Sequence, residues 1–125
     1  MRGVFLCYRE AAKVMIKQDK GGKIIGACST AGYKGYPMIA RYKITVNSYC
    51  PGLIDTTMTQ TSNEEIAKLR GLTVEEVAAN SVKNIPLGRT GQPDDVANVV
   101  SFLASKDSDY ITGQSILING GLYFS

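Results

Sequence analysis

The spacing between two strand-like runs constrains the fold of this chain more than any other feature. Residues 23–29 and 43–49 are short apolar runs flanked by glycine or proline, which is typical of buried strands. Parallel neighbouring strands are joined by a crossover of a dozen or more residues, usually a helix. The thirteen residues between these runs include Gly32, Gly35 and Pro37 and have no helical period, so we expect a loop there. A parallel sheet built from them therefore lacks its crossover helix.

The remaining pattern alternates helices with one more strand. Apolar residues at helical spacing predict a helix over 2–18, and Ser115–Ile118 predicts a final strand. Residues 56–61 are polar, and we expect them to be mobile. Shorter helices are expected over 62–71, over 73–83, where Thr73 and Glu76 form a capping box, and from 92 onward. This order predicts a single α/β domain, residues 1–125, with a parallel sheet of about three strands and flanking helices.

The residue inventory excludes several kinds of chemistry. Histidine is absent, which excludes Ser-His and Cys-His nucleophile systems within this chain and removes the commonest zinc ligand. The three cysteines, Cys7, Cys28 and Cys50, are odd in number and widely spaced, so we expect free thiols rather than a disulfide framework or a metal site.

Charge and hydropathy argue against two classes of partner. The net charge of +3 is small and scattered, so we expect no nucleic-acid binding. The apolar run after Gly3 stops at Arg9, too short for a signal peptide or a membrane span, so we expect no membrane association and a cytoplasmic protein.

Several segments, taken in order and at their spacing, match a known family. They are 22–25, 28–32, 44–47, Pro51-Gly52, 85–89, 110–114 and Asn119-Gly120-Gly121. Together they resemble the C-terminal half of the short-chain dehydrogenase/reductase family over nearly the whole chain. The segments 27–29 and 49–52 are similar to diacetyl/acetoin reductases and butanediol dehydrogenases.

The resemblance implies part of a Rossmann-like, doubly wound parallel sheet and a hydride transfer between NAD or NADP and a small carbonyl or alcohol. The family seats the coenzyme's pyrophosphate on a glycine-rich turn at a helix N-terminus. Nowhere in this sequence are two glycines two positions apart, so that turn cannot be written here. Coenzyme binding by this chain is therefore in doubt, and the choice between NAD and NADP is open.

The family's catalytic residues are Asn, Ser, Tyr and Lys, the last two in a Y-x-x-x-K motif. The resemblance places the Asn before the first helix, and Ser29 matches the family Ser. Tyr42 stands at the family's Ser-to-Tyr spacing, but Val46 occupies the Lys position. Two interpretations stay open: Tyr42 is the acid/base, or an internal deletion near residues 40–42 makes it a residue at the strand entry. Ser29 likewise either orients a substrate carbonyl or caps a strand.

Residues 51–56 match the family's nicotinamide-contact loop. The resemblance makes Pro51, Gly52, Ile54 and Thr56 cofactor-binding, with Ile54 on the ring and Thr56 on the carboxamide. The alternative is a plain turn after a strand. The resemblance also suggests that Arg89 and Asp94 either form a structural ion pair or mark the start of a helix.

The residues and the resemblance therefore indicate two alternative functions. The first is an oxidoreductase, impaired in this chain, and the second is a non-catalytic remnant that packs with full-length subunits. The apolar stripe of the first helix either faces the core or forms an interface of a homo-oligomer.

Overall fold

The sheet is parallel, as the sequence predicts. The computed structural model of the chain describes residues 2–27 and 37–124. Three strands lie in the order β1 (Gly22–Ala27), β2 (Ile44–Pro51) and β3 (Ser115–Ile118). Gly22 is in register with Ile44, and Ser48 with Ser115, both in parallel pairs.

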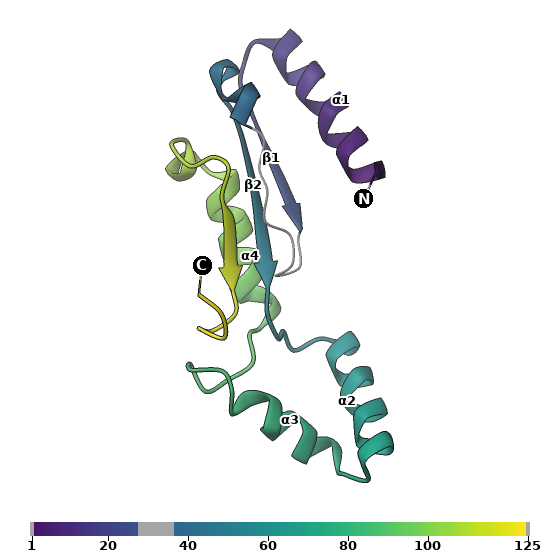
Figure 1. Cartoon of the computed structure of the whole chain (residues 1–125). Helices are drawn as coiled ribbons and strands as arrows, with labels where there is room; N and C mark the ends of the chain where they lie inside the picture. The colour runs from purple at the N-terminus through teal and green to yellow at the C-terminus, as the bar shows by residue number, and fades with distance from the viewer. Residues whose placement is uncertain (1, 28–36, 125) are drawn as a thin grey trace.

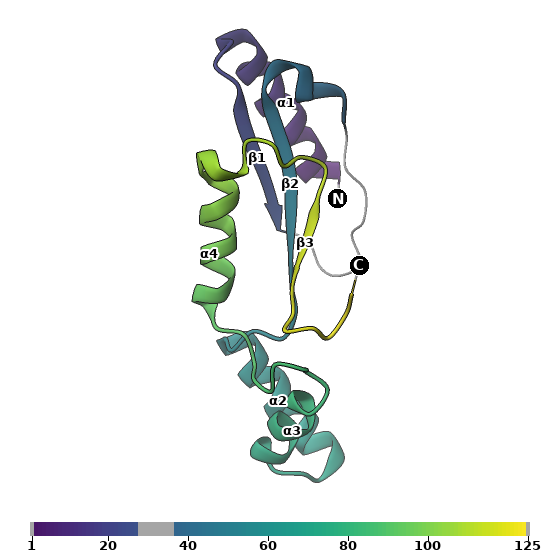
Figure 2. The same cartoon turned by 90° about the vertical axis from the view of Figure 1, so that its left-hand side faces the viewer.

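Helices α1 (Arg2–Gln18) and α4 (Pro93–Ala104) lie on opposite faces of this sheet (Figures 1 and 2). The core on the α1 side contains Ala12, Ile24 and Ile44, surrounded by half-buried Tyr8, Met15, Ile16, Tyr42 and Val46. On the other face α4 contacts both β1 and β2, and its Leu103 is fully buried. Burying an Ile or Leu side chain stabilises a fold by about 1.5–3 kcal/mol, so these two layers hold the strands in place.

Helices α2 (Thr57–Arg70) and α3 (Val74–Val82) project beyond the carboxyl ends of the strands (Figure 1). The expectation of a mobile segment over 56–61 is wrong, because α2 already begins at Thr57 with Thr56 as its N-cap. The predicted end is confirmed, since Gly71 adopts the left-handed conformation, with φ of 65°, that terminates a helix. The capping box of Thr73 and Glu76 at the start of α3 is also confirmed.

The crossover from β1 to β2 holds no α-helix within its described residues. Those residues form the 3-10 helix η1 (Pro37–Tyr42), and residues 28–36 lie outside the described part. The second strand begins at Ile44 rather than at 43, because Lys43 has a φ of 58° and cannot continue an extended strand. A second 3-10 helix, η2 (Lys106–Ser108), follows α4. Within the described residues, none of the helices is long and apolar enough to cross a membrane.

Candidate functional site

The carboxyl ends of the strands form the candidate site. In open parallel α/β sheets, ligands bind outside this edge. The strands β2 and β3 end there together, since Pro51 is in register with Ile118. The first strand ends at the same edge, because Ala27 pairs with Tyr49.

Gly52 joins the ends of β2 and β3 tightly. Its amide donates to the carbonyl of Ile118 at 2.9 Å. A Cβ at position 52 would stand 2.7 Å from the Asn119 Cβ and 2.8 Å from its Cα. Real Cβ atoms do not approach backbone that closely, so this junction needs glycine.

The backbone of Gly91 is hydrogen-bonded to the loop that follows β2. The Gly91 amide donates to the Leu53 carbonyl at 2.9 Å, and the Asp55 amide donates to the Gly91 carbonyl at 2.8 Å. These two bonds make an isolated parallel bridge between Ile54 and Gly91. A Cβ on Gly91 would meet the Ile54 Cδ1 at 2.5 Å, so the Ile54 side chain packs directly against this glycine. Gly91 therefore fixes the loop through hydrogen bonds to the residues on both sides of Ile54, Leu53 and Asp55.

Thr56 sits where this loop becomes helix α2. Its hydroxyl accepts from the Thr59 amide at 3.4 Å, a long capping bond, and lies 3.4 Å from the Thr59 hydroxyl. The Thr59 hydroxyl in turn donates to the Ile54 carbonyl at 2.6 Å. Thr56 is half-buried, and as the N-cap residue it places its hydroxyl at the positive end of α2.

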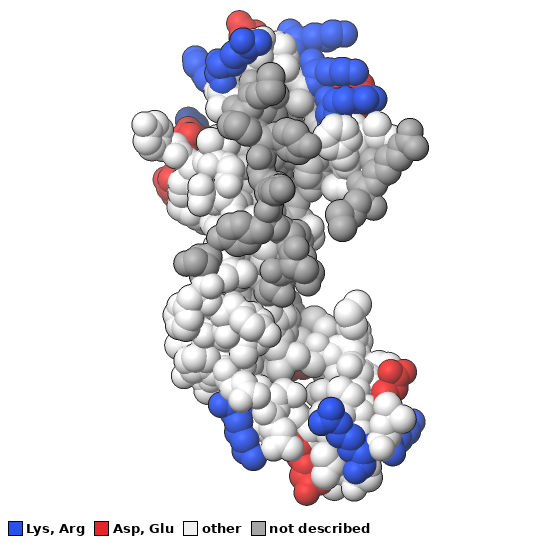
Figure 3. All heavy atoms as spheres, in the orientation of Figure 1, with Lys and Arg blue, Asp and Glu red and all other residues white. Residues whose placement is uncertain are grey.

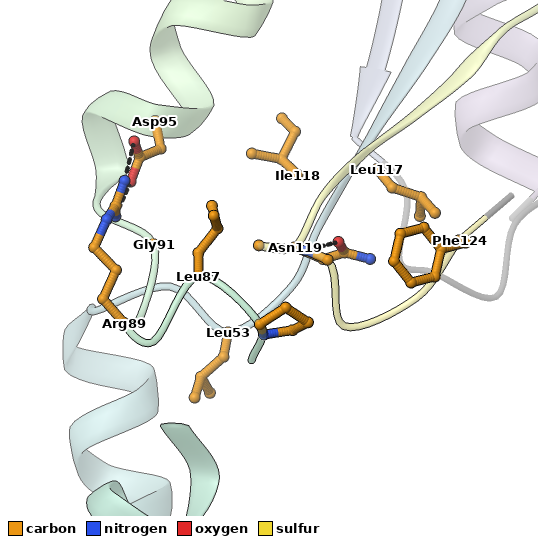
Figure 4. Close-up of a pocket in the computed structure, with 12 residues that line it drawn as sticks. Leu53, Leu87, Arg89, Gly91, Asp95, Leu117, Ile118, Asn119 and Phe124 are labelled. Atoms are coloured by element: carbon orange, nitrogen blue, oxygen red, sulfur yellow. Dashed lines mark hydrogen bonds and ion pairs between the residues drawn. The ribbon is translucent and has the colours of Figure 1, made fainter. Parts of the chain in front are cut away.

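A cavity of about 520 Å³ opens beside this loop (Figure 4). Its wall is mainly apolar, with Leu53 and Leu87 on one side and Leu117, Ile118 and Phe124 on the other. Asn119 is a polar group in this wall, but both ends of its amide are used: Oδ1 accepts from the Gly121 amide and Nδ2 donates to the Tyr123 carbonyl, both at 3.0 Å. The cavity therefore suits an apolar or weakly polar group.

Arg89 and Asp95 close one end of the cavity. The guanidinium donates to both carboxylate oxygens, at 2.7 and 3.0 Å. These bonds, with a further one from the Gln92 amide, lower the pKa of Asp95 to about 2. An ion pair of Arg89 with Asp94 is therefore wrong by one residue, whereas the expected helix start is confirmed, since Asp94 lies in the first turn of α4. Asp95 is the third residue of α4, and its carboxylate accepts from the Gln92 amide at 2.7 Å, which holds it beside the segment that carries Arg89.

The structure does not bring all the expected site residues together. Pro51, Gly52, Ile54 and Thr56 share the carboxyl edge, whereas Tyr42 precedes the amino end of β2. At about 3.3 Å per residue the eight residues of β2 span roughly 23 Å, which separates Tyr42 from this loop. The Tyr42 hydroxyl accepts from Arg41 Nη2 at 3.0 Å, and the Arg41 guanidinium lies over its ring. Ser29 lies outside the described residues.

Two residues at the carboxyl edge of the sheet, Gly91 and Asn119, were not predicted from the sequence as parts of the site. Gly91 clamps the loop from nearly forty positions away, and no local pattern marks such a partner. Asn119 was noted only as part of a glycine-rich ending, but its Cα and Cβ are what Gly52 packs against. Within the described residues, His, Cys, Asp and Glu side chains form no group of three or more that could hold a metal ion.

The chain is similar in sequence to known reductases and dehydrogenases. Residues 38–123 match the sequence model of the enoyl-(acyl carrier protein) reductase family. The diacetyl reductase [(S)-acetoin forming] of Staphylococcus epidermidis is 42% identical, covering 98% of this chain and 56% of the relative. A short-chain dehydrogenase/reductase of Armillaria gallica is 40% identical over 99% of this chain and 54% of the relative.

A solved structure shares the fold as well. Sorbitol-6-phosphate 2-dehydrogenase from Erwinia amylovora superposes with a TM-score of 0.83 at 34% identity, covering 98% of this chain and 57% of that one. The chain thus spans about half the length of the curated relatives it matches. The match to the Staphylococcus epidermidis protein runs over 144 residues, although this chain has only 125, so the relative holds at least 19 residues there without a counterpart. The family match over residues 38–123, with this agreement in fold, shows that the chain belongs to the short-chain dehydrogenase/reductase family.

Proposed function

We propose that this chain carries the nicotinamide-contact loop of an NAD(P)-dependent oxidoreductase for small carbonyls or alcohols of the diacetyl/acetoin type. The observation that carries the proposal is the clamped loop 51–56 at the carboxyl edge of the sheet, next to an apolar cavity. The similarity to a diacetyl reductase supports the substrate class.

The residues of this edge fit a nicotinamide group. A carboxamide has one acceptor and two donors, and the Thr56 hydroxyl can serve either kind of group. Ile54 offers an aliphatic surface two residues away, fixed against Gly91. The bound coenzyme would supply or accept the hydride, while Pro51, Gly52, Ile54 and Thr56 would hold and orient its ring.

The position of Tyr42 supports impaired turnover by this chain. An acid/base must reach the reacting oxygen within about 3 Å or through one water. Tyr42 lies at the opposite end of β2 from Thr56, and Val46 stands where the family has its Lys. Both facts favour Tyr42 as a strand-entry residue over Tyr42 as the acid/base. The absence of an α-helix from the described crossover residues supports a deletion in the same place.

Turnover tests the proposal directly. The purified chain and the Staphylococcus epidermidis relative would be assayed side by side for oxidation of NADH and NADPH in the presence of diacetyl. General acid–base catalysis contributes about 10²–10⁴-fold, so we expect the chain to be at least about a hundredfold slower. Comparable rates would contradict the proposal that turnover by this chain is impaired. Tyr42 would then be the first residue to substitute, as the candidate acid/base.

A second candidate is a non-catalytic chain that associates with full-length family members. The observation that favours it is the apolar surface of α1, where Val4 and Val14 keep 57% and 53% of their surface exposed. Co-purification with a full-length relative, lost when Val4 and Val14 are changed to Asp, would support it. Failure of the unchanged chain to co-purify would remove it.

A further inference from the structure

A second cavity, of about 1020 Å³, lies at the opposite edge of the sheet. It is bounded by the turn after α1, the start of β2 and the end of α4, all at the amino ends of the strands. Figure 3 shows Lys and Arg side chains gathered at the end of the molecule where α1 terminates. This cavity is separate from the candidate site at the carboxyl edge.

Lysine dominates the charge of its lining. Lys20, Lys23, Lys43 and Lys106 line it, and Asp109 is the one acidic residue among the described lining residues. The lining therefore carries a net charge of +3, from four lysines and one aspartate. The C-terminal carbonyls of α1 and α4 also face this edge, and each helix end contributes about −0.5 charge. Roughly two positive charges remain after that correction.

Only one of these lysines is neutralised. Lys23 forms an ion pair with Asp109 at 2.8 Å, donates to the Ser108 hydroxyl at 2.9 Å, and is 19% exposed. Within the described residues, no carboxylate pairs with Lys20, Lys43 or Lys106. Thr45, which is half-buried, also lines the cavity and carries a hydroxyl that can donate a hydrogen bond.

Lys20, Lys43 and Lys106 are exposed, line one cavity together with Thr45, and have no carboxylate partner among the described residues. Ammonium and hydroxyl groups are donors that suit a multiply charged oxyanion. The fold brings them together from three separate segments: Lys20 follows α1, Lys43 precedes β2 and Lys106 opens η2. We propose that this cavity binds the phosphate group of a small ligand.

Calorimetric titration of the purified chain with inorganic pyrophosphate tests the proposal. We expect saturable binding with a submillimolar Kd at low salt. Replacing Lys43 and Lys106 together by Gln should weaken binding at least tenfold, because the pocket then retains only Lys20 as an unpaired cation. The matched control replaces Lys68 and Lys83 by Gln, since both are exposed, lie on α2 and at the end of α3, and remove the same net charge.

Circular dichroism confirms that each variant is folded before titration. Binding that the pocket pair weakens and the control pair leaves within twofold supports the site. Absence of saturable binding below 10 mM, or equal weakening by both pairs, overturns it, since equal weakening reports net charge alone.

Discussion

Gly52 and Asn119 are packed so closely that no side chain fits between them: a Cβ on Gly52 would stand 2.7 Å from the Cβ of Asn119. The contact fixes the end of β2 to the end of β3, where the proposed nicotinamide loop begins. Rigid placement of a binding loop at a sheet edge preorganises the groups that it carries.

Substitution of Gly52 by Ala tests this contact. Overpacking a close contact costs about 1–3 kcal/mol, so we expect the free energy of unfolding in urea to fall by that amount. Gly3→Ala is the control, because Gly3 lies in α1 with nothing within 4 Å of an added Cβ. It should raise stability by about 0.5–1 kcal/mol through helix propensity. Equal stability of the Gly52 variant and the wild type would contradict the contact.

The Arg89–Asp95 pair predicts a pH dependence of stability. The pKa of Asp95 is about 2 in the folded chain against 3.8 ordinarily. A carboxyl with a lowered folded pKa stabilises the fold above its unfolded pKa, and that contribution disappears as pH falls through the folded pKa. We therefore expect Asp95→Asn to lower the Tm above about pH 4 and the difference from wild type to close toward pH 2.

Asp94→Asn serves as the control for this pair. Asp94 lies in the same first turn of α4 but makes no ion pair with Arg89 in the structure. Its Tm profile should follow that of the wild type. A larger loss of Tm for Asp94→Asn than for Asp95→Asn would contradict the stabilising role of the Arg89–Asp95 pair.

The buried Asn47 links β2 to the segment before β3 through hydrogen bonds of its side-chain amide. It is 4% exposed, its Nδ2 donates to the Ile111 carbonyl at 2.9 Å, and its Oδ1 accepts from the Gln114 amide at 3.1 Å. Asn47→Ala removes both hydrogen bonds, and a typical one contributes about 0.5–1.5 kcal/mol to stability. We expect the chain to lose about 1–3 kcal/mol in a chemical unfolding experiment. The exposed Asn98→Ala in α4 should change stability by less than about 0.5 kcal/mol.

The elements that local chemistry specifies could be predicted from the sequence. The bounds of α1, the capping box of Thr73 and Glu76, and the strand Ser115–Ile118 all match the structure. Their signals lie within a few residues of one another: apolar periodicity, reciprocal caps and a short apolar run.

Some features could not be predicted from the sequence. They depend on local hydrogen bonds that offset weak helix propensity, or on contacts between residues far apart in the chain. The Thr-rich start of α2 has weak helix propensity, yet Thr56 caps it and the Thr59 hydroxyl bonds back to the Ile54 carbonyl. The polarity of residues 56–61 alone therefore predicted a mobile segment. The contact of Gly91 with the loop is set by tertiary geometry, which no local pattern contains. Asp95 rather than Asp94 pairs with Arg89 because the Asp95 carboxylate also caps α4 at the Gln92 amide.

An amide NMR titration of the purified chain with NADH tests most directly whether the loop 51–56 contacts the nicotinamide. We expect weak binding, with shift changes concentrated at residues 52–59. Thr56→Ser, which keeps the hydroxyl and the helix cap, should preserve these changes, and Thr56→Val should abolish them while the rest of the spectrum stays folded. Shift changes elsewhere only, or none up to 10 mM NADH, would contradict the account.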